Sequence, residues 1–261
     1  MKRALIAVAI VLCALGGFLA WRASRRGPGP DFDVDWSPAH ALSAGVSVRE
    51  GKLASAPAWR IVDLSMDPSL ATVRVQQTPG GARLADLIPP GAVAAVNGGY
   101  FDEHFRPTGW LVSENKEISG KQSRAQGGVL AMEKGRLFVG PMAALPFTPE
   151  LAVQNSPRLI EPDGTVGIRS DDKKRAARTL ACDAEGRLHL VVIAAPTGDG
   201  PTLLEAARWL AADPSLGGLG CSAALNLDGG PSTGVWLPAS SGVADVHGAA
   251  PIAYALAVLP R

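Results

Sequence analysis

The chain has 261 residues and is nearly balanced in charge, with 25 Lys and Arg, 24 Asp and Glu and a formal net charge of +1. Five of the basic residues lie within positions 1–26, which leaves 20 basic against 24 acidic residues, a net charge of −4, for the rest. This balance argues against the basic face that nucleic-acid binding requires, so no nucleic-acid partner is expected. The length of the remainder suits one large domain with a substantial core.

The N-terminal segment, residues 1–26, is the first predicted element. Lys2 and Arg3 precede an uncharged stretch over residues 4–21, which is at the short end of the about 20 apolar residues that a spanning helix needs. We expect an uncleaved signal anchor, because arginines follow this stretch where a cleavage site would need small residues; a cleaved signal peptide is the alternative. The membrane is thus an expected partner, with the orientation left open by basic flanks on both sides. The domain is expected to be extracytoplasmic on this anchor, or secreted or periplasmic if the segment is cleaved.

Residues 27–40 are rich in Gly, Pro and Asp and predict a stalk that cannot be helical, so that the folded domain spans residues 41–261. Two cysteines lie in this domain, Cys182 and Cys221. An oxidising compartment permits a disulfide between them, but buried free thiols are also common, and the sequence does not fix the distance between them. Both alternatives stay open.

Short apolar and β-branched runs alternate with turn residues along the domain. Turns this short leave no room for crossover helices, so antiparallel pairing is expected. One helix is predicted over residues 202–212, where Thr202 and Glu205 fit a capping box. The predicted class is α+β, a single domain of mainly antiparallel or mixed β-sheet with a few helices. In chain order, the predicted strands are 59–64, 71–75 and 92–96, and the predicted hairpins pair 109–112 with 117–118, 129–132 with 137–139, and 179–182 with 188–193.

Two of the predicted strands end in a glycine turn with polar side chains. The strand at 92–96 runs into a turn at 97–102 that begins Asn-Gly-Gly, and the strand at 223–225 runs into a turn at 226–233 that contains Asp228. Glycines let the backbone adopt positive φ and approach a ligand closely. If the strands are neighbours, Asn97 and Asp228 converge on one pocket, as an amide that orients a substrate and a carboxylate for acid/base or nucleophilic work. The alternative is two ordinary turns with capping hydroxyls.

A basic stretch over residues 173–178 leads directly into the strand that begins at Thr179. Arg178 lies beside the strand and is better placed to be held in a pocket than the lysines before it. Its planar fork of donors suits phosphate oxygens. The alternative for Arg178 is a surface or structural ion pair.

These elements, in this order, resemble the phosphodiester glycosidase family, whose animal members include an enzyme that removes N-acetylglucosamine from its phosphodiester on mannose. Bacterial relatives are associated with exopolysaccharides. The resemblance covers most of the domain and runs through residues 97–102, 106–109, 156–160 and 163–164, Arg178 with Thr179, the capped helix with Glu205, residues 220–221 and residues 226–233. Three positions depart from the family pattern: Tyr100 stands for Phe, Pro231 for Gly and Thr233 for Ser. Because proline lacks an N–H, a phosphate cradle at this turn has one donor fewer.

The resemblance implies hydrolysis of the C1–O bond of a sugar 1-phosphodiester, with a phosphomonoester as the leaving group. Asp228 would be the carboxylate at the reacting centre, Arg178 would bind the phosphate, and Asn97 would orient sugar or phosphate oxygens. The backbone amides of residues 229–230 would complete the anion contacts. The implied substrate-binding residues are Gly98, Gly99, Tyr100, Asp102, Thr179, Gly229, Gly230, Ser232 and Thr233, with Glu205 behind them.

Several residues keep two interpretations. Asp102 and Glu205 are candidate second carboxylates, but a turn aspartate and a helix-capping glutamate are the plainer interpretations. The histidines and cysteines show no zinc-ligand spacing, so no metal or cofactor is expected; a calcium or magnesium ion on Asp228 or Asp102 is the alternative. Trp110 and Trp236 are interpreted as core residues rather than sugar platforms. One alternative function is a non-catalytic, membrane-anchored protein for glycan binding or exopolysaccharide assembly. Another is a protein-interaction module whose double-glycine turn is purely structural.

Overall fold

The structure is a computed structural model that describes residues 32–53, 59–123, 127–195 and 200–261. The predicted signal segment and the first part of the predicted stalk lie outside these residues. Residues Phe32–Arg261 form one compact unit. Within the described ranges, no helix has both the length and the apolar character that crossing a membrane would require.

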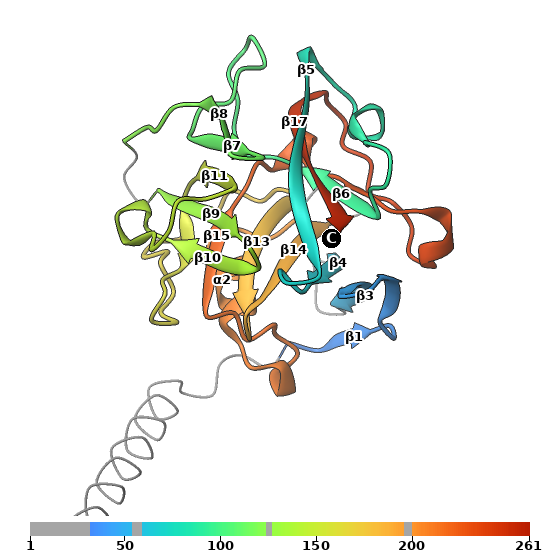
Figure 1. The fold of residues 1–261 in the computed structure, drawn as a ribbon. Coiled ribbons are helices and arrows are strands. Elements are labelled where there is room, and N and C mark those ends of the chain that lie inside the picture. The colour runs from blue at the N-terminus through green and yellow to red at the C-terminus, as the bar shows by residue number, and fades with distance from the viewer. Residues whose placement is uncertain (1–31, 54–58, 124–126, 196–199) are drawn as a thin grey trace, which may run out of the picture. The chain divides into compact units, whose positions relative to one another are not determined.

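The described residues form three antiparallel β-sheets (Figure 1). The largest sheet has the order β1-β3-β4-β14-β13-β15-β12, and β2 also pairs with β3. The second has the order β10-β9-β11-β7-β8, and the third β16-β6-β17-β5. The strands of the largest sheet are β1 (Val34–Trp36), β2 (His40–Ser43), β3 (Val46–Leu53), β4 (Trp59–Met66), β12 (Arg158–Ile160), β13 (Arg178–Ala184), β14 (Arg187–Ala194) and β15 (Ala223–Asn226).

The other two sheets hold the remaining strands. The second sheet consists of β7 (Leu111–Ser113), β8 (Lys116–Ser119), β9 (Gly128–Glu133), β10 (Arg136–Gly140) and β11 (Leu151–Asn155). The third consists of β5 (Ala71–Ala82), β6 (Ala94–Asn97), β16 (Val235–Trp236) and β17 (Ile252–Pro260). All three predicted hairpins form, as β7–β8, β9–β10 and β13–β14. Their turns hold residues at positive φ, such as Asn115, Gly135 and Gly186, which allow two strands to reverse within a few residues.

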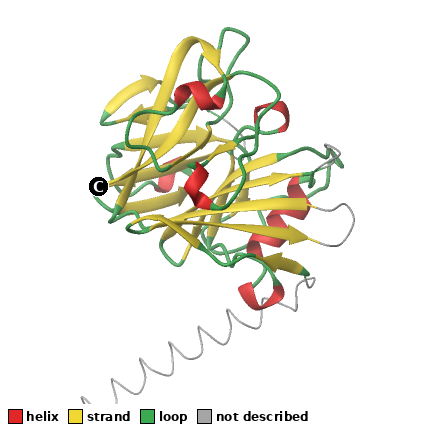
Figure 2. Ribbon diagram, turned by 90° about the vertical axis from the view of Figure 1, so that its right-hand side faces the viewer, coloured by secondary structure: helices red, strands yellow, loops and turns green. Residues whose placement is uncertain are grey.

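The predicted few helices reduce to one α-helix in the described chain, α2 (Leu203–Ala211). The other helical segments there are single 3-10 turns: η1 (Leu84–Leu87), η2 (Met142–Ala144), η3 (Pro214–Leu216), η4 (Gly230–Ser232) and η5 (Ala239–Ser241). The predicted capping box is present, because the Thr202 hydroxyl accepts from the amide of Glu205 at 3.2 Å and the Glu205 carboxylate accepts from the amide of Thr202 at 3.0 Å. The domain is therefore mostly antiparallel β-sheet with one capped helix (Figure 2).

The core is divided into two main clusters by the largest sheet. Val62 and Leu64 of β4 belong to the cluster shared with the other two sheets, whereas Ile61 belongs to the cluster that α2 covers. Trp209 and Leu210 fill that second cluster from the helix. Since the central strands are buried on both faces, they read as continuous apolar runs rather than as alternating ones.

A disulfide joins Cys182 on β13 to Cys221, with 5.8 Å between the two Cα atoms. Cys221 lies in the segment between α2 and β15, and its amide donates to Leu210 at the end of the helix. The bridge therefore ties the helix-to-strand connection to the middle of the largest sheet. Of the two alternatives for these cysteines, the structure thus shows the disulfide and not two buried free thiols.

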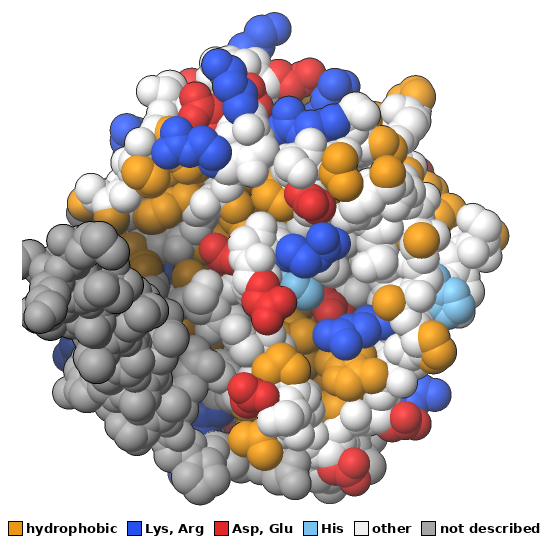
Figure 3. Space-filling view, turned by 60° about the horizontal axis from the view of Figure 1, so that its bottom comes forward, with side chains coloured by type: hydrophobic (Ala, Val, Ile, Leu, Met, Phe, Trp, Pro, Cys, Tyr) orange, Lys and Arg blue, Asp and Glu red, His pale blue; other side chains and the backbone are white. Residues whose placement is uncertain are grey.

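A buried charged network crosses β3, β4 and β14. Asp63 is 1 % exposed, and its carboxylate contacts His189 Nδ1 at 2.8 Å and accepts from Arg49 Nε at 2.9 Å. Although burial acts to raise it, the pKa of Asp63 lies below its ordinary value, because His189 and Arg49 stabilise the carboxylate. The network thus stabilises the fold above the unfolded pKa near 3.9, and this contribution is lost as the pH falls through the lower folded pKa. On the face shown in Figure 3, basic and acidic side chains are interspersed rather than gathered by sign.

The boundary of the folded domain lies earlier than predicted. Residues Val34–Trp36 form β1 on the edge of the largest sheet, and the amide of Phe32 donates to Leu216 at 2.9 Å. The predicted stalk at 27–40 therefore extends too far. Phe32, Val34 and Trp36 alternate with aspartates and pack against the α2 cluster, which is the period-2 pattern of a strand.

Candidate active site

Three chain segments meet at one place: the end of β6, the start of β13 and the turn that follows β15. The Asn97 side-chain amide donates to the carbonyl of Asp228 at 2.9 Å, and the amide of Asp228 donates to Gly98 at 3.1 Å. The amide of Gly230 donates to Ala177 at 2.8 Å. The prediction that Asn97 and Asp228 share a pocket required β6 and β15 to be neighbouring strands. They are not neighbours, because β6 belongs to the third sheet and β15 to the largest. Their ends meet where these two sheets adjoin.

Asn97 holds this junction together from within. It is 0 % exposed, and its Nδ2 donates to the carbonyls of Asp228 and Gly98. Its Oδ1 accepts from the Thr179 hydroxyl at 2.5 Å and from the Gly234 amide at 3.0 Å. All four hydrogen-bonding positions of the side chain are therefore used. We revise the predicted role of Asn97 from a substrate contact to a positioning residue, and the same burial applies to Thr179.

The two glycines after Asn97 are required by a neighbour that the sequence did not reveal. A Cβ on Gly98 would lie 2.1 Å from the ring of Tyr254, and one on Gly99 would lie 2.7 Å from its hydroxyl. The Tyr254 hydroxyl accepts a hydrogen bond from the amide of Gly99 at 2.8 Å. Both glycines are buried, so the space beside them is filled by β17 rather than by a ligand. Their role as substrate-binding residues stays a prediction.

Asp228 lies half-buried at the rim of this junction. Its Oδ1 accepts from the amide of Gly229 at 2.9 Å, and the Ser232 side chain also donates to the carboxylate. Burial raises the pKa of Asp228 above its ordinary value, and the two hydrogen bonds only partly oppose this effect. No basic side chain lies within ion-pair distance of the carboxylate in the described part of the chain. Asp228 is thus a carboxylate with enhanced proton affinity at the rim of the junction between two sheets.

Arg178, the first residue of β13, lies against the same turn. A Cβ on Gly229 would be 3.8 Å from Arg178 Cδ. The guanidinium donates through Nε to Pro201 O at 3.1 Å and through Nη2 to Lys174 O at 2.7 Å. These carbonyls fix its direction without neutralising it. Burial lowers the pKa of Arg178, while the nearby Tyr100 and Asp172 act to raise it.

The predicted anion cradle of backbone amides at 229–230 is not formed. The amide of Gly229 is bonded to the Asp228 carboxylate and that of Gly230 to Ala177. Gly230 adopts a φ of 61°, which closes the turn against β13. Ser232 and Thr233 are also buried, and of the two only Ser232 contacts the Asp228 carboxylate. An anion at this site would therefore meet side chains rather than the turn's amides.

The two candidate second carboxylates are occupied elsewhere. Asp102 accepts from the amide of His104 at 2.9 Å and pairs with Arg106 at 2.8 Å within its own loop. The pKa of Asp102 is lowered, first by the hydrogen bond from the Arg106 amide. Glu205 caps α2 and pairs with Arg175 at 2.5 Å. Within the described ranges, no group of three His, Cys, Asp or Glu side chains gathers that could hold a metal ion.

Polar groups that the sequence did not single out complete the junction. Asn226 donates through Nδ2 to the Tyr100 hydroxyl at 2.8 Å and to Ser156 O at 3.2 Å, while its buried Oδ1 has no protein partner in the described structure. Asn155 Nδ2, at the end of β11 and 3.4 Å from a Cβ on Gly99, is unpartnered in the same sense. A buried polar atom without a partner costs about 1–3 kcal/mol. Asn155 could have been singled out from the sequence, because it is a polar residue at the end of an apolar strand and directly precedes Ser156.

The junction combines a half-buried carboxylate, a fixed guanidinium and a tyrosine hydroxyl on an antiparallel β scaffold. Such a site suits a hydrolase that acts on an anionic substrate. The sequence profile of the phosphodiester glycosidase family matches residues 90–259, which include every element of this junction. The chain belongs to the phosphodiester glycosidase family.

Solved structures share the fold at low sequence identity. A hypothetical protein from Synechocystis has a TM-score of 0.61 at 17 % identity over 86 % of this chain, which spans 64 % of that protein's length. A protein from Burkholderia pseudomallei K96243, described as exported, has a TM-score of 0.53 at 16 % identity, over 78 % of this chain and 74 % of the other. No curated protein matches the chain. These similarities show a shared fold and say nothing about the substrate, which has to be inferred from the site.

Proposed function

We propose that the domain hydrolyses the C1–O bond of a sugar 1-phosphodiester, and that Asp228 is the carboxylate at the reacting centre. The observation that supports this most is that Asp228 and Arg178 both lie at the turn after β15, each half-buried, and neither is in an ion pair within the described part of the chain. Family membership supports the glycosidase class of the reaction. The sugar itself, N-acetylglucosamine or another, follows from resemblance alone.

In this proposal a water oxygen attacks C1 and a phosphomonoester leaves with the former bridging oxygen. Asp228 accepts the proton of the attacking water or stabilises positive charge at C1. A carboxylate whose pKa is raised by burial is a stronger base than one in water. The leaving phosphomonoester needs little help from a general acid, which fits a site whose other carboxylates are occupied.

Arg178 binds the phosphate, with the Tyr100 hydroxyl beside it. Two carbonyls hold the guanidinium through Nε and Nη2, and Nη1 has no partner among the residues that the structure describes, so the planar group has a fixed direction. A phosphate would compensate the burial that now lowers the pKa of Arg178. Asn97 and Thr179 keep the three segments in register and touch no substrate atom.

We also infer that the domain works outside the cytoplasm, tethered through its N-terminal segment or released from it. The Cys182–Cys221 bridge supports an oxidising compartment. A glycan-binding protein without turnover would use the same junction. It is distinguished by retained binding without release of sugar.

The bond that breaks is the direct test of this proposal. The full-length protein is given N-acetylglucosamine 1-(methyl phosphate) in H2¹⁸O, and the phosphate product is analysed by mass spectrometry. Cleavage of C1–O leaves methyl phosphate without ¹⁸O, because the bridging oxygen departs with phosphorus. Free sugar exchanges its anomeric oxygen with water, so the phosphate is the readout. Label in the phosphate, or no release of methyl phosphate, would overturn the proposal.

A further inference from the structure

A groove lies beside β16, the strand that follows the turn with Asp228. It consists of two adjoining cavities of about 690 and 200 Å³, and both are bordered by Trp236, Asp245 and His247. The larger volume lies within the range of about 300–1,000 Å³ that small-molecule sites occupy. None of these three residues has a part in the site described above.

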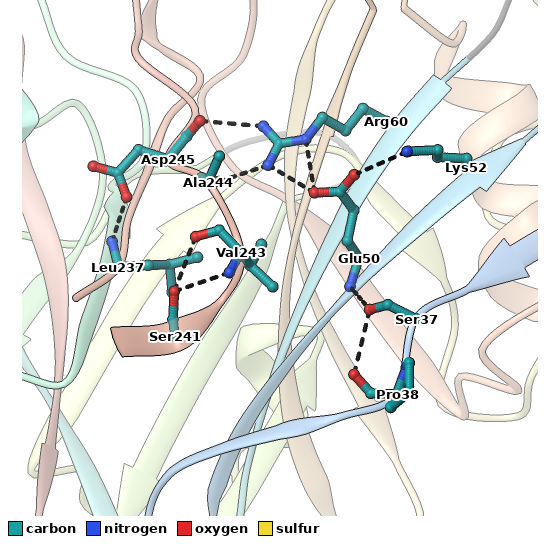
Figure 4. Close-up of polar contacts among 10 residues, drawn as sticks. All are labelled: Ser37, Pro38, Glu50, Lys52, Arg60, Leu237, Ser241, Val243, Ala244 and Asp245. Atoms are coloured by element: carbon teal, nitrogen blue, oxygen red, sulfur yellow. Dashed lines mark hydrogen bonds and ion pairs between the residues drawn. The ribbon is translucent and has the colours of Figure 1, made fainter. Parts of the chain in front are cut away.

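The walls of the groove are fixed by side chains from the largest sheet (Figure 4). Arg60 of β4 donates to the carbonyls of Ala244 at 2.6 Å and Asp245 at 3.1 Å, and it is itself held by Glu50 at 2.9 Å. Asp245 Oδ1 accepts from the amide of Leu237 at 2.8 Å, across the groove's own loop. A wall that is already ordered loses little entropy when a ligand binds.

In contrast to the fixed walls, several side chains that line the groove are free to contact a ligand. Trp236, interpreted from the sequence as a core residue, is only half-buried, with Ala95, Ala257 and Leu259 packed against it. Arg83 and His247 are exposed, and neither side chain has a hydrogen-bond or ion-pair partner among the residues that the structure describes. The second oxygen of Asp245 is likewise unengaged there. An indole with hydrogen-bonding groups of both kinds around it matches a pyranose ring, which has apolar C–H faces and a rim of hydroxyls.

The groove is backed directly by the turn that carries Asp228. The amide of Ala250 donates to the carbonyl of Pro231 at 3.1 Å, and a Cβ on Gly248 would lie 2.9 Å from the same oxygen. Val235 and Val246 exchange backbone hydrogen bonds at 3.0 Å, which joins β16 to the groove's far wall. We infer that the groove is an accessory site for a saccharide unit of the glycan on which the domain acts. This inference rests on the proposed function for the identity of its ligand.

Saturation-transfer NMR with the full-length protein tests the site, using N,N′-diacetylchitobiose, cellobiose, maltose and lactose as probes. At least one disaccharide should receive saturation through its ring protons. The Arg83→Ala/His247→Ala double variant changes only exposed side chains and should weaken its binding at least about fivefold. Trp236→Leu should abolish the signal, and Arg208→Ala, an exposed change on α2, should leave it as in wild type.

The two proposals fail separately. Asp228→Asn should bind the disaccharide as wild type does, because the groove does not use that carboxylate. If the phosphodiester is never hydrolysed but this binding persists, only the proposed reaction is wrong. If no probe binds, or if the double variant binds as tightly as wild type, the accessory site is wrong, whatever the activity.

Discussion

Asp228 and Arg178 carry opposite charges beside the same turn and are both shifted toward their neutral forms by burial. An ion pair would relieve both shifts, yet the chain directs the guanidinium to two carbonyls and the carboxylate to Ser232 and Gly229. Uncompensated charge of this kind is more common at functional sites than elsewhere. In our account the substrate supplies the missing partners, phosphate for Arg178 and developing positive charge at C1 for Asp228.

The hydrogen bond from Ser232 sets part of the acidity of Asp228. Removing it in Ser232→Ala withdraws a group that lowers the pKa, so the pKa of Asp228 should rise further. Activity that needs the carboxylate ionised is lost as the pH falls through this pKa. The acid limb of kcat/KM should therefore move to higher pH in the variant, as a pH–rate profile would show. Ser240→Ala changes an exposed serine and should leave the limb in place; an unmoved limb in Ser232→Ala would exclude Asp228 as the titrating group.

Gly98 is a residue-scale requirement of packing. In Gly98→Ala the new methyl would stand 2.1 Å from the buried ring of Tyr254, so that β17 or the Asn97 turn must shift. Overpacking of this kind costs about 3 kcal/mol. Urea unfolding followed by circular dichroism measures the loss.

Gly120→Ala is the matched control, because Gly120 is exposed and its new methyl would lie 4.0 Å from Glu117 Oε1. Its free energy of unfolding should stay within about 0.5 kcal/mol of wild type. Equal stability of the two variants would show that Tyr254 does not fill the space beside Gly98.

At the scale of elements, the disulfide connects the parts that position Arg178. It closes a loop of sequence separation 39 between β13 and the segment after α2. The helix start also holds Arg178, through the carbonyl of Pro201. Loosening this connection should therefore affect both the stability of the domain and the direction of the guanidinium.

The Cys182→Ala/Cys221→Ala variant should lose about 4 kcal/mol of stability, the chain-entropy value for a loop of this length. Urea unfolding without reductant measures the difference, and wild-type protein in reductant should approach the variant. A double variant as stable as oxidised wild type would show that the bridge does not constrain the unfolded chain.

The elements also differ in how far they could be predicted. The three hairpins and the capped helix follow from local signals, such as turn residues that accept positive φ and the Thr202–Glu205 box. β17 was not predicted, although it lies between β5 and β6 in the third sheet. Its partners are about 160–190 positions away in the chain, and no local pattern encodes such pairing. The first strand was assigned to a stalk because Asp and Pro outweighed the alternation of Phe32, Val34 and Trp36.

At the scale of the whole molecule, the sequence predicted which segments form the site. It did not predict which of their residues only position the others and which can contact a substrate. Family motifs placed Asn97, Arg178 and Asp228 together, and the structure brings their segments into contact. The division into buried positioning groups and accessible reacting groups depends on burial, which single residues do not reveal. Tyr254 was missed because it comes from β17, whose neighbours are remote in sequence.

The central claim is that Asp228 acts at the reacting carbon, and Asp228→Asn tests it most directly. The change keeps the size of the side chain and removes its charge. With N-acetylglucosamine 1-(methyl phosphate) as substrate, we predict a fall in kcat/KM of at least about 100-fold, or about 2.7 kcal/mol, with an unchanged urea midpoint as proof of folding. A kcat/KM within about twofold of an active wild type would contradict the account.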